Sequence, residues 1–280
     1  MHDKKAFVSD LAKRLSFQEY LVNSSESVSW SAHRDAEKLN DLKLFPYFKD
    51  FLETEKDNDI RRSVYFPVAS IGGHNNDPKI LNYLIARIGL EKTRRTKSTI
   101  LDNTWQFYKE NTIDLHPELE KLIYNKWWQI VWPALDLLGI CKQKEEAENI
   151  IHEYLKSDIK KSKYLLDEAL TALLKVGSKK SYHWFEDYLD FGFNDMVGAC
   201  VAGIAKFGDN GMERMTEILL NHRNGWAKAS ALSSILRLGG KNELDSVLKY
   251  VKKQQKKPSI YYLHDKEAID EFIQKYSSKD

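Results

Sequence analysis

Apolar residues recur along the chain in a pattern anchored on glycine. Gly177, Gly208 and Gly239 lie 31 residues apart, and apolar residues precede each by twelve, eight, four and one positions. Steps of four, four and three keep these residues on one helical face. We expect three helices that bury this face and end at the glycine, which supplies a left-handed C-terminal residue. The apolar residues are Leu165, Ala169, Leu173 and Val176, then Met196, Cys200, Ile204 and Phe207, then Ala227, Ala231, Ile235 and Leu238.

The pattern extends upstream with less regular spacing. Gly72 and Gly139 complete two further units, a weaker unit ends near Asn40, and a poor match without glycine lies near Tyr108. A period of this size indicates stacked helical hairpins, here about seven. The apolar faces expected for the units that end at Gly72, at Gly139 and near Asn40 are, in that order, Ile60, Val64, Val68 and Ile71, then Trp127, Val131, Leu135 and Leu138, then Val28, Ala32, Ala36 and Leu39. Longer loops are expected at Glu110–His116 and Ser157–Ser162.

A second helical segment follows each of these positions, and no stretch alternates like a strand. We therefore predict an all-α fold, a right-handed α-solenoid of about seven helical hairpins in a single domain over 1–280. A cap at 1–23 contains helix Lys4–Val22, the repeats span 24–255, and a cap at 256–280 contains helix Glu267–Tyr276 after a basic linker, Lys252–Lys257. The second helices are Leu42–Leu52, Lys79–Ile88, Pro117–Tyr124, Glu145–Leu155, Ser181–Leu189, Gly211–Leu220 and Asn242–Val251.

These units resemble HEAT-like, armadillo-like repeats, including the short form of phycobilin-lyase-type repeat proteins. The resemblance covers roughly 24–251, and the run Asp59-Ile60-Arg61-Arg62 is similar to the start of the family's second helix. The family's arginine position is Trp128, Leu166, Val197 and Lys228 in other units, so only one unit keeps it. The resemblance implies that a concave groove is lined by the family's second helices, which correspond here to the helices that end at the glycines. Such arrays serve as scaffolds, inhibitors, transport factors and occasional enzymes, which leaves a lyase-like role on a bilin open.

Composition narrows the function classes. Charged residues make up 30% of the chain with a net charge of +2, which is not the footprint of a dedicated duplex binder. The N-terminus lacks the features of a signal peptide, and no apolar run reaches the roughly 20 residues of a membrane helix, so we expect a cytoplasmic protein that does not enter the membrane. Cys141 and Cys200 are expected to be free thiols, Cys200 on a buried face. The eight histidines show no metal-ligand spacing, and no cofactor motif is present.

Tryptophans on one predicted helix are candidate binding residues. Trp128 and Trp132 are four apart and share a face, and Trp226 begins another such helix. They either form an aromatic binding surface or fill gaps in the repeat packing. HEAT-like alkylpurine DNA glycosylases carry paired tryptophans followed by an acid, but Trp132 occupies the position of their catalytic aspartate. Asp136 restores that spacing one turn later, so catalysis requires Asp136 to point into a basic groove beside Trp132.

Basic residues recur two positions before each of the three glycines. These are Lys175, Lys206 and Arg237. Stacked repeats would align them into a basic ridge for an acidic partner or a phosphate backbone. Alternatively, a cation in the last helical turn stabilises the helix dipole by roughly 0.3–1 kcal/mol.

Together these patterns predict a non-catalytic module whose groove binds a protein partner, which the basic ridge indicates is acidic. An assembly scaffold and an inhibitor or immunity-type protein are both consistent with this class. A nucleic-acid-binding or degenerate glycosylase-like protein is the alternative. We expect no catalytic or metal-binding residue, and the predicted partner-binding residues are Arg62, Phe66, Trp128, Gln129, Trp132, Lys175, Lys206, Trp226 and Arg237.

Overall fold

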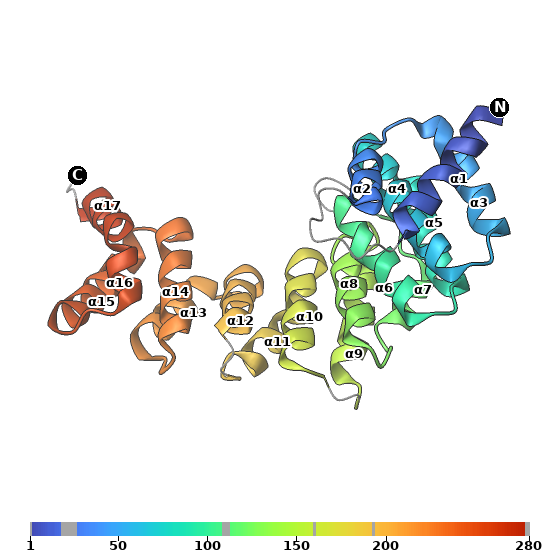
Figure 1. The fold of residues 1–280 in the computed structure, drawn as a ribbon. Helices are drawn as coiled ribbons and strands as arrows, with labels where there is room; N and C mark the ends of the chain where they lie inside the picture. The colour runs from blue at the N-terminus through green and yellow to red at the C-terminus, as the bar shows by residue number, and fades with distance from the viewer. Residues whose placement is uncertain (1, 18–26, 108–112, 159–160, 192–193, 278–280) are drawn as a thin grey trace. The chain divides into compact units, whose positions relative to one another are not determined.

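The computed structural model describes residues 2–17, 27–107, 113–158, 161–191 and 194–277, and all regular elements in these ranges are helical. The chain divides into two compact units, 1–143 and 144–280 (Figure 1). The all-α fold of successive helical hairpins is confirmed, whereas the single domain over 1–280 stays a prediction. None of the described helices combines the length and the apolar character that crossing a membrane requires.

The first unit holds the helices up to α8. Alternate helices pack on one another, so that α2, α4, α6 and α8 follow in one layer while α5 contacts α4, α6 and α7 from the other layer. The bounds are α1 His2–Ser16, α2 Val28–Glu37, η2 Leu42–Leu44, α3 Phe45–Thr54, α4 Asn58–Asn75, α5 Pro78–Leu90, α6 Arg94–Asn103, η3 Thr104–Phe107, α7 Pro117–Leu122 and α8 Trp128–Leu138.

The second unit repeats this arrangement. Helices α10, α12, α14 and α16 form consecutive contacts in one layer, and α13 packs against α12, α14 and α15. The bounds are α9 Lys144–Lys156, α10 Lys163–Val176, η4 Lys179–Ser181, α11 Tyr182–Tyr188, α12 Asn194–Phe207, α13 Gly211–Asn221, α14 Gly225–Leu238, η5 Lys241–Glu243, α15 Leu244–Lys256, α16 Ile260–His264 and α17 Lys266–Ser277.

The predicted buried face is confirmed at all but one of the twelve positions before the three evenly spaced glycines. The exception is Leu238, which is 59% exposed. Upstream, the prediction is wrong for Val28 and Trp127, which are exposed because each stands at or just before a helix start, where fewer neighbours cover it. Cys141 and Cys200 are buried free thiols, as predicted.

The predicted role of the glycines is wrong in its mechanism. Gly177 and Gly239 have φ of −67° and −75°, in the extended region rather than the left-handed one. A β-carbon on Gly177 would lie 2.5 Å from the Leu173 carbonyl oxygen, and one on Gly239 would lie 2.6 Å from the Ile235 carbonyl oxygen. These positions therefore require glycine because the chain passes close to the end of its own helix. Of the described residues other than glycine, Asn76 alone has a positive φ, 52°, and it ends α4.

Three element boundaries also differ from expectation. The basic run 252–257 is not a linker, because α15 continues to Lys256. Helix α16 was not predicted, and its five residues begin after Ser259, whose hydroxyl accepts a hydrogen bond from the amide of Tyr262. Helix α1 ends at Ser16, and the rest of the first predicted cap helix, like part of the loop 110–116, falls largely outside the described residues.

Candidate functional site

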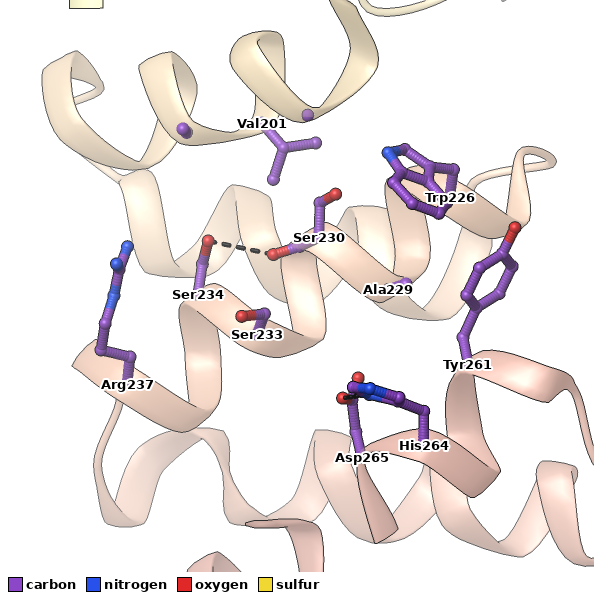
Figure 2. Close-up of a pocket in the computed structure, with 12 residues that line it drawn as sticks. Val201, Trp226, Ala229, Ser230, Ser233, Ser234, Arg237, Tyr261, His264 and Asp265 are labelled. Atoms are coloured by element: carbon purple, nitrogen blue, oxygen red, sulfur yellow. Dashed lines mark hydrogen bonds and ion pairs between the residues drawn. The ribbon is translucent and has the colours of Figure 1, made fainter. Parts of the chain in front are cut away.

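A cavity of about 340 Å³ lies in the second unit between α12, α14 and α16 (Figure 2). Helix α14 contributes a stripe with spacings of four, three and four residues: Trp226, Ser230, Ser233 and Arg237. Eleven residues make about three helical turns, so the first and last members of the stripe share a face and lie about 16 Å apart along the axis.

Aromatic rings close one end of this cavity. Trp226 and Tyr261 meet edge to face, with ring centroids 5.3 Å apart (Figure 2). Trp226 is the second residue of α14, and the side chain of the N-cap residue Asn224 accepts a hydrogen bond from the Trp226 amide at 2.8 Å. Because Tyr261 belongs to α16, the ring pair joins two elements that are far apart in the sequence. The pair forms a fixed apolar wall.

Small side chains leave the middle of the cavity open. Gly198 and Ala202 of α12 face Ala229 and Ser230 of α14 across it. The hydroxyl of Ser234 donates to the carbonyl oxygen of Ser230 at 3.0 Å, within its own helix. A β-carbon on Gly198 would come no closer than 3.8 Å to the nearest side-chain atom, the Trp226 indole nitrogen, so space remains there.

The remaining sides of the cavity are charged or titratable. Arg237 is exposed at the end opposite the aromatic pair, and no described carboxylate pairs with it (Figure 2). His264 and Asp265 lie on the third side, with the His264 Nδ1 2.9 Å from the Asp265 Oδ1. The cavity thus combines an apolar end with a guanidinium end, an arrangement suited to a ligand that carries an anionic group.

Two further cavities in the first unit share Trp105 as a lining residue. One, of about 320 Å³, is lined by Phe66, His74 and Gln106 among others, and the second, of about 250 Å³, by Trp132 and Asp136 among others. Trp105 lines both cavities and is 58% exposed. The structure therefore places the predicted residues Phe66 and Trp132 in two cavities that share Trp105 as a lining residue.

Other predicted residues lie apart from these cavities' described walls. Arg62 pairs with Asp59 at 3.1 Å, and burial together with the nearby Arg95 lowers its pKa. Trp128 is 57% exposed at the first position of α8. The neighbouring Gln129 has a buried side-chain oxygen without a hydrogen-bond partner among the described residues.

The three cations of the predicted ridge have different surroundings. Arg237 lines the cavity of the second unit, and Lys175 lies in the last turn of α10. Lys206 donates a hydrogen bond to the carbonyl oxygen of Leu174 and lies 4.9 Å from the centroid of the Phe207 ring. Its cation thus bonds a carbonyl oxygen in the last turn of α10, the neighbouring helix, and not the end of its own helix α12.

Sequence reasoning missed Trp105, the serines of α14, Tyr261 and the pair His264 and Asp265. The serine stripe is visible in the sequence as small residues four, seven and eight positions after Trp226. Trp105 gave no such signal, because it lies in η3, where a 3-10 turn interrupts the helical spacing. Among the described residues, no three histidine, cysteine, aspartate or glutamate side chains are placed to hold a metal ion.

The chain is similar to the solved complex of CpcE and CpcF of phycocyanin lyase from Nostoc sp. PCC7120, with a TM-score of 0.45 and 12% sequence identity over 91% of this chain and 99% of that chain. This is a protein of the type that the repeats resemble in sequence. No protein-family model matches the chain, and no curated protein matches its sequence.

Proposed function

We propose that the protein is a non-catalytic protein-binding module that holds an extended acidic segment of a partner in the cavity between α12, α14 and α16. The observation that carries this proposal is the stripe from Trp226 to Arg237, which places an aromatic wall and a guanidinium that pairs with no described carboxylate on one helical face. Its length of about 16 Å matches about five residues of extended chain, at roughly 3.3 Å each.

Each end of the stripe has a distinct part in this binding. The rings of Trp226 and Tyr261 offer apolar area to a large side chain, and tryptophan is enriched among residues that dominate interface energies. Arg237 offers a carboxylate two parallel hydrogen bonds, and such bonds to charged groups contribute about 1.5–3 kcal/mol. The serines between them offer hydroxyl groups to a peptide backbone.

The test is selection of binding peptides from a random 12-residue display library, followed by calorimetry on the selected sequences. We expect acidic peptides with a large apolar residue, whose affinity falls at least tenfold in Arg237→Glu and in Trp226→Ala. Arg34→Glu is the matched control for charge, since Arg34 is also exposed in the last turn of its helix, and Trp30→Ala is the control for the ring. Equal affinities in Arg237→Glu and the wild type would refute the proposal.

One observation favours a second candidate, the glycosylase-like activity. Trp132 and Asp136 line the same cavity, as that activity requires. However, the other charged residue among its described walls is Asp102, an acid rather than the expected base. Release of N7-methylguanine from a duplex, lost in Asp136→Asn, would support this candidate, and no release above the spontaneous rate would exclude it.

A further inference from the structure

The 250 Å³ cavity beside Trp105 has a composition that the proposed peptide site does not explain. Two neighbouring helical segments each contribute a tryptophan and an aspartate three or four residues apart: Asp102 and Trp105 from α6 and η3, and Trp132 and Asp136 from α8. Both spacings place the ring and the carboxylate on one helical face. Leu101 and Pro133 complete the described walls.

The cavity is open to ligands and negatively charged. Trp105 is 58% exposed and Trp132 is 48% exposed, so both indoles retain uncovered surface. The described residues that line the cavity include no lysine or arginine. Asp102 accepts a hydrogen bond from the Ser98 hydroxyl at 3.3 Å, and no described cation pairs with it. Partial burial raises the pKa of Asp102 despite that bond, as expected where no cation among the described residues offsets the loss of water.

Tryptophan faces attract cations through the ring quadrupole, and aromatic residues around a cavity favour methylated ammonium groups over neutral groups of the same shape. Carboxylates add Coulomb attraction, which strengthens as water is excluded. The volume lies below the roughly 300–1,000 Å³ of cavities for drug-sized ligands, which suits the end of a side chain better than a nucleoside.

We propose that Trp105, Trp132, Asp102 and Asp136 form a binding site for a methylated ammonium group, carried by a lysine side chain of the protein partner. This inference rests on the proposed function for its source, a partner protein. The ammonium chemistry rests on the cavity alone. The first unit would bind a cationic side chain of the partner, and the second unit would bind the partner's acidic segment.

The test compares two probes of nearly the same shape, choline and its neutral isostere 3,3-dimethyl-1-butanol, by calorimetry and by tryptophan fluorescence of the full chain. We expect choline to bind at least tenfold more tightly. Trp105→Ala, Trp132→Ala and Asp102→Asn should each reduce choline affinity at least fivefold. Trp132→Phe should keep part of it, because a phenyl ring still presents an aromatic face, whereas Trp132→Leu should lower the preference for the cation as much as Trp132→Ala does.

The matched controls are Trp30→Ala and Asp50→Asn. Both residues are exposed and lie outside the described walls of the cavity, so neither substitution should change choline affinity. Circular dichroism confirms that each variant keeps its helix content. Equal binding of choline and its isostere would overturn the ammonium site.

A trimethyllysine peptide and N7-methylguanosine complete the set of probes. Tight binding of the peptide supports the partner side chain as the source of the ammonium group. Binding of the nucleoside without choline or peptide assigns the cavity to a nucleobase and overturns the proposal. Binding of choline but not of the peptide overturns the lysine source. Because the peptide selection for Arg237 reports on the second unit, its failure is distinguishable from each of these results.

Discussion

Two glycines of α12, five residues apart, should respond in opposite directions to the same substitution. Gly198→Ala adds a methyl group 3.8 Å from the Trp226 indole nitrogen and 4.0 Å from the Ser230 hydroxyl, which are ordinary contact distances. Gly203→Ala places the same group 2.2 Å from Phe185 Cγ and 2.3 Å from its Cδ1. Phe185 is fully buried and stacks on Phe207 with centroids 5.7 Å apart, so its ring cannot move aside without disturbing the core.

The magnitudes follow from two opposing effects. Alanine is favoured over glycine inside a helix by roughly 0.5–1 kcal/mol, and this gain applies equally to both positions. Gly198→Ala should therefore raise the free energy of unfolding by about 0.5–1 kcal/mol. Overpacking costs typically about 1–3 kcal/mol, and an overlap of this size belongs near the upper end. Gly203→Ala should therefore lower the free energy of unfolding by about 2 kcal/mol, a difference of about 3 kcal/mol between the variants.

Calorimetric unfolding of the full chain and hydrogen exchange of the α12 and α14 amides measure this difference. Hydrogen exchange is needed because a chain of two compact units need not unfold in one step, and local protection isolates the unit that carries the change. A shift of the same sign in both variants would refute the packing argument. Gly198→Ala also reduces the cavity, so it should weaken the selected peptides although the protein is more stable.

Other predictions concern buried polar groups and one glycine. Glu148→Ala should cost about 3 kcal/mol or more in urea unfolding, because the carboxylate accepts hydrogen bonds from the Ser178 amide and hydroxyl and from the Ser181 hydroxyl at 2.6–2.9 Å, whereas exposed Glu153→Ala should change stability by less than about 0.5 kcal/mol. Burial lowers the pKa of His152 below its unfolded value, so the unfolded chain binds the proton more readily and stability should fall as pH drops from 7.5 to 5.5. His152→Gln should reduce this dependence of stability on pH, and an unchanged dependence would contradict the prediction. The pKa of Glu148 is lowered as well, so protonation of Glu148 affects stability only at pH values below this range. Gly177→Ala should destabilise by more than 1 kcal/mol in the same urea assay, since the clash is with backbone and not with a flexible side chain.

The repeat pattern predicted the elements well because local periodicity decides them. The face Met196, Cys200, Ile204 and Phe207 is buried, as steps of four, four and three require. Errors arose where position within the helix matters more than periodicity. Leu238 satisfies the pattern but is exposed in the last turn of α14.

The site was only partly predictable. Trp226 and Arg237 were both named from the sequence, and their shared face follows from spacing along one helix. Tyr261 could not be named, because its ring reaches Trp226 only through the packing of α16 on α14. Likewise, the cavity shared by Trp105 and Trp132 depends on contact between α6 and α8. Long-range contacts of this kind leave no periodic trace in one sequence.

The sequence by itself determined that the chain is helical and which face most of the repeat helices bury, although it missed α16 and the C-terminal part of α15. These properties depend on residues within a few helical turns. The need for glycine at 177 has a local cause that the spacing alone did not reveal, since the carbonyl oxygen of Leu173, in the same helix, leaves no room for a β-carbon there. Only the tertiary structure decided which side chains enclose a cavity, because a cavity depends on the distance between helices, and packed side chains set that distance.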